Sequence, residues 1–449
     1  MSGAAGRPVD LEDLPQPVLA ALVREYLLCG HLIDRAGMPY VIAAHGRTQM
    51  GEIAIDEWMG ASPVYTARMQ RLLGFEGDDV ATVFKGMQFD IGAPHGFLDF
   101  RYTVHDEHNG EFHLDHCGAL MDVEPMGEEF VHTMCHDIED PTFEATATAT
   151  NRRARLAPLH RPPRQPADRT PHCAWTIRID PAAEPIPTAE ITARVAGGVV
   201  AATPLAGIAG ASPHGAGPGS GDGLRRDYAG PLVDRIATEE FGAETLRAVI
   251  EEVCIQQHLL AEAFMLAVEQ RHGEAAARAL GEHQFVGSAG ISAHRLGRAL
   301  GELGITGPAD PDRDTDRDTD LLDELGAVLS LHPALRPHSL VDAVVEVRPD
   351  EVRVALRDCP GTAAASRLNW PALLRDGCDR PLQAIATAID PRLVVSIDPV
   401  GEGELLAWSI AVGSAELAEQ PEVELARFST GTDFELPRPR PTSVVLQNR

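Results

Sequence analysis

Basic residues are scarce in this 449-residue sequence, which has 38 Lys and Arg against 67 Asp and Glu and a formal net charge of −29. A surface of this sign repels phosphate backbones, so we expect no nucleic-acid partner. No apolar run is long enough to span a bilayer, and the first residues lack the apolar stretch of a signal peptide. We therefore expect a cytoplasmic protein with no membrane partner.

Cysteine is also sparse, and its count of seven is odd. Without an export signal, such a count does not indicate a disulfide framework. The sequence has no Cys-x-x-Cys pair, Gly-rich phosphate loop, Ser-His-Asp order or His-Glu-x-x-His motif. These absences remove support for a zinc finger, a nucleotide site, a serine hydrolase and a metalloprotease. The cysteines are then ligands, nucleophiles or core residues.

Three of the cysteines lie between residues 95 and 181, each beside a histidine, as His116-Cys117, Cys135-His136 and His172-Cys173. We predict a hairpin from strands 97–106 and 111–117, turned at His108-Asn109-Gly110, because Asn-Gly favours tight hairpin turns. Cys117 then ends a strand. Cys173 begins another, in which Cys173, Trp175, Ile177 and Ile179 share one face.

Cys135 is expected near the end of a short helix that cannot pass Pro141 unbroken. Two strand ends and a helix end would bring the three thiols together. Upstream, residues 11–77 are predicted to be helical, with breaks at Gly37–Pro39 and Ser62-Pro63.

A self-comparison indicates that the sequence contains a duplication. With an offset of 227, matches include His31 with His258, His45-Gly46 with His272-Gly273, Arg68 with Arg295 and Gly74 with Gly301. With an offset of 243, Pro94-His95 matches Pro337-His338 and Cys135 matches Cys378. Histidines present in both copies are expected to serve packing.

The predicted fold class is α+β, with two tandem copies of a module in which N-terminal helices precede an antiparallel sheet, packed as a pseudo-dimer. We expect a first module at 11–200, a Gly/Ala/Pro linker at 201–225, a second, degenerate module at 226–414 and a tail at 415–449. The tail after Gln420 is expected to pack little. Alternating aspartates between 310 and 320 are expected to form a solvated loop rather than a calcium site.

The two copies differ at the cysteines, which points to chemistry in the first. The second copy has Asp358-Cys359, Cys378-Asp379 and, opposite Cys173, Leu406. We therefore expect Cys117, Cys135 and Cys173 to bind a metal, most simply zinc, with His136 or His116 as fourth ligand or general base. In a second hypothesis, Cys135 is a nucleophile flanked by His132 and Glu139 on a helix. A third treats the thiols as buried apolar residues.

Several of these stretches resemble the L-2-aminothiazoline-4-carboxylate hydrolase-like family. The resemblance covers residues 14–181 and, more faintly, 240–413. It rests on Ile55-Asp56-Glu57-Trp58, a hairpin ending at Cys117, Cys135-His136 followed by Pro141-Thr142-Phe143, Pro162-Pro163-Arg164, and Cys173-Ala174-Trp175. It implies a hydrolase that opens a small cyclic amidine or thiazoline, with Cys117, Cys135 and Cys173 as site cysteines.

The sequence thus predicts a metal-dependent hydrolase acting on a small molecule. Its expected catalytic residues are His136, His116 and Glu139, and its expected metal ligands are Cys117, Cys135, Cys173 and His136. The alternative is a non-catalytic protein that binds a small ligand, iron or haem through the same cysteines. Association into a homo-oligomer stays open.

Overall fold

The computed structural model describes residues 8–208, 223–306 and 317–436, and it confirms the α+β class. The first half contains helices α1 (Gln16–His31), α2 (Ile33–His45), α3 (Arg47–Leu73), α4 (Val80–Met87), α5 (Gly118–Val123), α6 (Glu128–His132), α7 (Glu139–Thr148) and α8 (Glu190–Ala196). The second half contains α9 (Ala243–His272), α10 (Glu274–Glu302), α11 (Arg317–Leu331), α12 (Trp370–Arg375), α13 (Arg380–Ile389) and α14 (Pro421–Ala426). Within the described residues, no helix combines the length and apolarity needed to cross a bilayer.

Each half contributes one antiparallel sheet of four strands. The first consists of β1 (Leu98–Val104), β2 (Asn109–Cys117), β3 (Ala154–His160) and β4 (Cys173–Ile179), in the order β1-β2-β4-β3. The second consists of β5 (Ala343–Val347), β6 (Glu351–Arg357), β7 (Leu393–Ile397) and β8 (Glu404–Val412), in the order β5-β6-β8-β7. The strand order is therefore the same in the two sheets.

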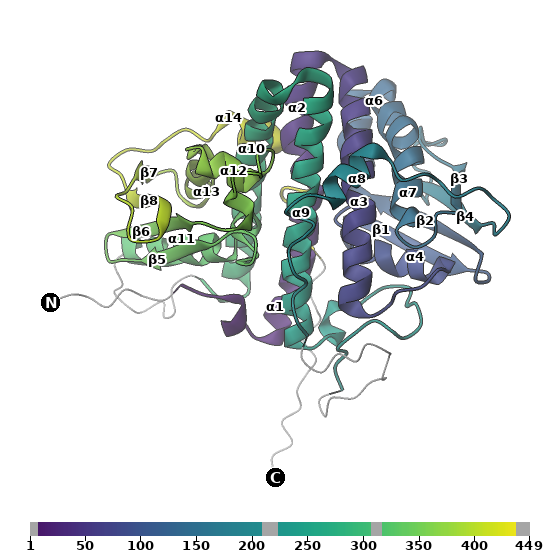
Figure 1. Cartoon of the computed structure of the whole chain (residues 1–449), viewed down its shortest axis with the longest axis horizontal. Coiled ribbons are helices and arrows are strands. Elements are labelled where there is room, and N and C mark those ends of the chain that lie inside the picture. The colour runs from purple at the N-terminus through teal and green to yellow at the C-terminus, as the bar shows by residue number, and fades with distance from the viewer. Residues whose placement is uncertain (1–7, 209–222, 307–316, 437–449) are drawn as a thin grey trace, which may run out of the picture.

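Long helices stand side by side in the middle of the molecule, and the two sheets lie on opposite sides of them (Figure 1). In this layer α3 packs along α9, and α10 packs along α2. Gly46 and Gly273 each join two of these helices, with φ of 84° at both positions. Only glycine adopts this backbone readily, so both are suited to the sharp corner between consecutive helices.

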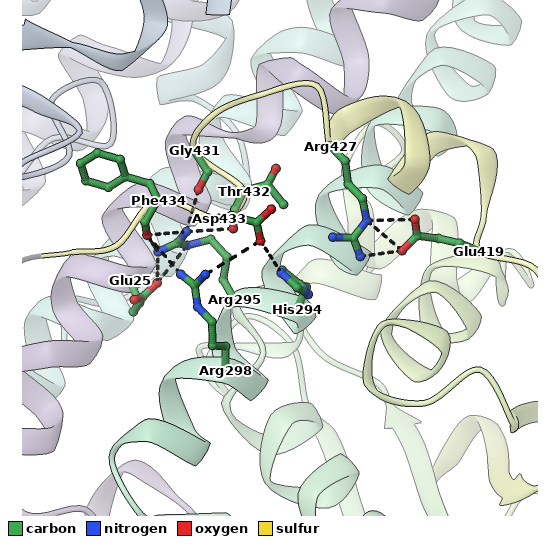
Figure 2. Close-up of polar contacts among 10 residues, drawn as sticks. All are labelled: Glu25, His294, Arg295, Arg298, Glu419, Arg427, Gly431, Thr432, Asp433 and Phe434. Atoms are coloured by element: carbon green, nitrogen blue, oxygen red, sulfur yellow. Dashed lines mark hydrogen bonds and ion pairs between the residues drawn. The ribbon is translucent and has the colours of Figure 1, made fainter. Parts of the chain in front are cut away.

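Two buried ion pairs join the halves in a reciprocal way. Arg68 on α3 donates to Glu252 on α9 at 2.5 and 2.9 Å. Arg295 on α10 donates to Glu25 on α1 at 2.9 and 2.7 Å (Figure 2). In both cases the partner lies in the other half, and corresponding residues are 227 positions apart.

The same two arginines also hold main-chain carbonyls that follow a short helix. Arg68 donates to the carbonyls of Ala201 and Thr203, downstream of α8. Arg295 donates to those of Gly431 and Thr432, downstream of α14 (Figure 2).

The prediction that the tail packs little is wrong for residues 421–436. Helix α14 buries Val423 and Ala426 and packs against α10 and α2. Gly290 on α10 permits this approach, because a Cβ at that position would lie 2.3 Å from a methyl of Val423. The proline and charge content concealed the small apolar face of α14.

Local details of the first half also differ from prediction. The hairpin is present, but Asn109 and Gly110 are already in strand β2, and Gly110 does not adopt positive φ. The Asp106 carboxylate accepts from the amide N–H of His108 at 2.8 Å and from the Asn109 side chain, which stabilises a longer loop instead.

Three prolines expected to break or bound a helix lie inside one. Pro39 is within α2 and Pro63 within α3, because tertiary packing outweighs one lost hydrogen bond. The helical run around Cys135 continues past Pro141 through a π-helix at Thr133–Ile138, which places Pro141 in the first turn of α7. A missing N–H is tolerated there.

Some predictions fall outside the described residues. These are the linker at 209–222, the aspartates of 310–316 and the tail at 437–449. The last aspartates of the alternating run, Asp318 and Asp320, belong to α11 rather than to a loop.

Candidate functional site

A cavity of about 210 Å³ lies in the first half, between the inner face of its sheet and the helices α2, α3, α6 and α7. Its walls are mostly apolar and include Met38, Phe84, Phe100, Phe112, Leu114 and Phe143. Phe100 on β1 and Phe112 and Leu114 on β2 face the cavity because alternate side chains of a strand point to the same face. A concave, mainly apolar pocket with a few polar groups is typical of a small-molecule site.

Glu139, the first residue of α7, is the most unusual polar group of the wall. Its Oε2 is buried and has no hydrogen-bond partner in the described part of the chain. Burial raises the pKa of Glu139 to about 8, and the nearby charge of Asp140 adds to this effect while Arg161 opposes it. The carboxyl is therefore largely protonated at neutral pH and can donate a proton.

A second carboxyl of the wall is part of a defined hydrogen-bond network. Asp90 accepts from the Tyr65 hydroxyl at 2.6 Å and from the Gly92 amide at 2.6 Å. Burial raises its pKa to about 6, although both hydrogen bonds oppose this shift. Because two groups of the protein donate to its carboxyl, Asp90 is held in a fixed position and is less suited to react with a ligand.

The third polar group of the wall lies on α1 and α2. It consists of His31, Asp34 and Arg35, and Arg35 donates to Asp122 at 3.2 Å. Burial lowers the pKa of His31 well below its usual value and raises that of Asp34. The sequence analysis assigned His31 to packing and missed Asp34 and Arg35. In the sequence, Asp34 and Arg35 are distinguished only as polar residues between two apolar helical stretches.

The three cysteines between residues 95 and 181 do not line this cavity. Cys117 ends β2, Cys173 begins β4 and Cys135 lies in the π-helix, and all three are buried. They are close enough to Glu139 that its negative charge would raise the pKa of each thiol. Cys117, Cys135 and Cys173 belong to one cluster of buried residues, with Cys135 inside the π-helix rather than at the predicted helix end.

The neighbouring histidines make other contacts. His136 Nε2 lies 2.7 Å from the carbonyl oxygen of Pro162, and the ring stacks on His132 at 4.3 Å. His116 stacks near Phe434. His172 Nδ1 accepts from the backbone amide of Cys117, not from its thiol.

This arrangement bears on both chemical roles expected for the cysteines. In the described part of the chain, no group of three or more His, Cys, Asp or Glu side chains is arranged to hold a metal ion. Burial raises the pKa of Cys117 to about 12 and those of Cys135 and Cys173 well above their usual range. An activated nucleophile needs a shift in the opposite direction.

Comparison with known proteins found no matching family, no matching curated protein and no matching solved structure. The resemblance to the aminothiazoline carboxylate hydrolase-like family therefore stays a prediction.

Proposed function

We propose that the first half is a hydrolase that adds water to the C=N bond of a small cyclic molecule bound in the cavity. One observation carries this proposal: Glu139 is on the cavity wall, has a pKa of about 8 and has one carboxyl oxygen that finds no partner among the described residues. A carboxylic acid that stays protonated near neutral pH is suited to general acid–base catalysis.

The chemistry needs only one such group. Glu139 gives its proton to the substrate nitrogen while the oxygen of water bonds to the C=N carbon, and the attacking water returns a proton to the carboxylate. The ring C–N or C–S bond then breaks, and its electrons leave with the heteroatom. That heteroatom takes the proton of Glu139, and the hydroxyl proton returns to Glu139 as the new C=O forms.

The size and lining of the cavity support a ring as substrate. A cavity of ~150 Å³ lined by apolar side chains is large enough for benzene. The present cavity, at about 210 Å³, leaves room for a ring with one substituent. A cyclic amidine or thiazoline of the kind implied by the sequence resemblance falls in this range.

We infer further that the two halves are copies of one module related by a rough two-fold axis. The identical strand orders and the reciprocal pairs Arg68–Glu252 and Arg295–Glu25 support this inference. In an isologous contact, residue i of one copy meets residue j of the other, and j meets i. On this basis α14 and the segment after it belong to the second module, as α8 belongs to the first.

The duplication also explains why we place chemistry in the first half alone. By the offset of 227, His31 and Trp58 of the cavity correspond to His258 and Phe285. Trp370 stacks on Phe285 at 4.9 Å and meets His258 edge-on at 5.6 Å. An indole thus fills the space that corresponds to the cavity. The counterparts of Asp34 and Glu139, at offsets of 227 and 243, are Ala261 and Leu382.

The test is turnover of a panel of cyclic amidines and thiazolines, including 2-aminothiazoline-4-carboxylate, followed by chromatography. We expect Glu139→Gln to lower kcat by about 10²-fold or more, since the amide cannot exchange the proton. Glu262→Gln is the matched control, because Glu262 is a buried carboxyl whose pKa is also about 8 but which lies away from this cavity. Equal activity of Glu139→Gln and wild type would refute the proposal. Binding without turnover would favour the non-catalytic alternative.

The second candidate is a zinc-dependent form of the same hydrolysis, favoured by the proximity of Cys117, Cys135, Cys173 and Glu139. The side-chain arrangement described above does not fit a metal, so no step is derived through one. Elemental analysis decides: about one zinc per chain supports this candidate, and its absence contradicts it. In the zinc form, Cys135→Ser abolishes turnover, whereas Cys378→Ser leaves it intact.

A further inference from the structure

Apart from Glu139, the cavity contains a second polar centre that the proposed mechanism does not use. Trp58 Nε1 donates to Asp34 Oδ2 at 2.9 Å. Glu57, the residue before Trp58 on α3, is fully buried, and Gln284 Nε2 from α10 donates to its Oε1 at 3.2 Å. The polar centre therefore consists of two carboxyls, an indole N–H and an amide from the other half.

Three buried atoms at this centre lack a hydrogen bond of full geometry among the described residues, although the Asp34 and Glu57 carboxyls interact with each other and the His31 ring interacts with the backbone of Ile91. These atoms are Asp34 Oδ1, Glu57 Oε2 and His31 Nδ1. His31 is only 7% exposed and, like Asp34, lies on the cavity wall. Two carboxyls that hydrogen-bond each other share one proton, so a cation bound at the cavity wall could take the place of that proton and leave Asp34 ionised.

The adjacent cation does not fill this role, because it is already paired. Arg35 donates to Asp122 at 3.2 Å and its Nη2 lies 3.3 Å from His31 Nε2. Asp122 is itself buried and also accepts from Ser429 and Thr430. The charge of Arg35 is thus neutralised locally by Asp122.

We propose that Asp34 binds the cationic head of the ligand, a protonated amidine or amine that is attached to an otherwise apolar ring and is separate from the C=N nitrogen to which Glu139 gives its proton. Glu57 and Gln284 act as positioning residues that hold Asp34 in place. This inference rests on the proposed function only for the location of the pocket. It adds the charge and the orientation of the ligand.

The electrostatics of the centre agree with a cationic ligand. Burial raises the pKa of Asp34 and, together with the neighbouring Asp34, that of Glu57. Two carboxyls this close do not both ionise without a cation. A ligand that brings one positive charge restores an ion pair inside an apolar cavity, where such a pair is stronger than in water.

The second half has a direct part in this site. Gln284 is separated from Glu57 by 227 residues, the offset of the duplication. In a symmetric pair of modules, the residue at this position in one copy would contact the identical residue in the other copy. Gln284 replaces one of the two carboxyls with an amide that donates to the other, so the second half completes the site although its own counterpart of the cavity is filled.

The experiment compares benzamidine, a cation at neutral pH, with benzamide, its neutral analogue, by calorimetry and by the fluorescence of Trp58. We expect wild type to bind benzamidine at least about tenfold more tightly than benzamide. Asp34→Asn should bring the ratio of the two Kd values close to one. Gln284→Ala should lower the ratio, whereas Gln284→Asn, which keeps an amide, should retain part of it.

The matched control is Glu139→Gln, which lies on the same wall and should abolish turnover while leaving the ratio unchanged. If wild type binds both compounds equally, or if folded Asp34→Asn keeps the preference for benzamidine, the cation site at Asp34 is refuted. The proposal that the cavity binds a small molecule is then unaffected. If Glu139→Gln alone removes the preference, the head group binds at Glu139 instead. If neither compound binds and indole does not bind either, the small-molecule pocket itself fails.

Discussion

His45 and His272 stack face to face, with ring centroids 3.6 Å apart and 4° between the ring planes. Each is the last residue of its helix, α2 or α9, and each precedes a glycine with φ of 84°. The two residues are related by the offset of 227, so under the proposed duplication each copy would contribute the same side chain to one contact.

This stack gives a prediction about pH. Burial, with the neighbouring His45 and Arg271, lowers the pKa of His272 in the folded state. A histidine whose folded pKa is depressed contributes stability above its unfolded pKa of ~6.5, and this is lost as pH falls through the folded pKa. The Tm difference between wild type and His272→Gln should therefore be larger at pH 7.5 than at pH 5. A difference that does not change with pH would contradict this account.

The ion pairs Arg68–Glu252 and Arg295–Glu25 should contribute similarly to the free energy of unfolding. Arg68→Met and Arg295→Met each leave a buried glutamate without its partner, which costs about 3–5 kcal/mol of unfolding free energy. Arg278→Met, which breaks the exposed pair with Asp376, should cost less than about 1 kcal/mol. Urea unfolding measures all three. A large loss from only one of the two buried arginines would count against the two-fold relation.

We propose that the indole of Trp370 fills the space in the second half that corresponds to the cavity, so removing this indole should open a cavity there. Trp370 is 2% exposed, and Trp370→Ala should cost about 3–5 kcal/mol. Added indole should then raise the Tm of Trp370→Ala more than that of Trp408→Ala, a variant that loses a buried tryptophan of the second sheet instead. Equal effects of indole on both variants would show that Trp370 does not fill a ligand-sized space.

The pH profile of turnover should follow Glu139. Because the acid form donates the proton, kcat/KM should be constant below its pKa and fall above pH of about 8, the pKa of the buried carboxyl. Replacing Asp140 with Asn removes a charge that raises this pKa, so the fall should shift to lower pH. A profile that rises through pH 8 would assign Glu139 the role of a base instead.

The C-terminal segment should close one side of the cavity. Phe428 lies on the cavity wall, and Asp122 accepts from Ser429 Oγ at 2.6 Å and from the Thr430 amide at 2.7 Å. Asp122→Ala removes these contacts and leaves Arg35 unpaired. We expect faster proteolysis within 427–436 and weaker ligand binding, while a matched exposed change, Asp168→Ala, should alter neither.

The sequence was sufficient for the fold class and for several element ends. The alternation in 173–179 and the position of Cys117 at a strand end followed from local patterns, because one face of the sheet is buried. Breaks at Pro39 and Pro63 were predicted wrongly, because packing between α2, α3 and their neighbours decides the outcome there.

The site was harder to predict because its groups come together only through long-range packing. The cysteine pattern pointed to residues 95–181, which include part of the cavity wall, but Cys117, Cys135 and Cys173 do not line the cavity. Glu139 was expected to be catalytic, but on the ground that it neighbours Cys135 on a helix. Asp34, Glu57 and Gln284 meet across helices that are far apart in the sequence, and no local spacing reveals such a contact.

The path of the last described segment has a consequence for biosynthesis. The ribosome delivers residues in order, yet Phe428 lines a cavity whose other wall residues were synthesised hundreds of residues earlier, and Ser429 beside it donates to Asp122. Arg295 fixes the segment by its carbonyls, as Figure 2 shows. The first half therefore cannot complete its pocket during its own synthesis. The cavity wall is complete only after Phe428 has been synthesised, when nearly the entire second half has emerged from the ribosome. We therefore expect a nascent chain to bind ligand only after this point.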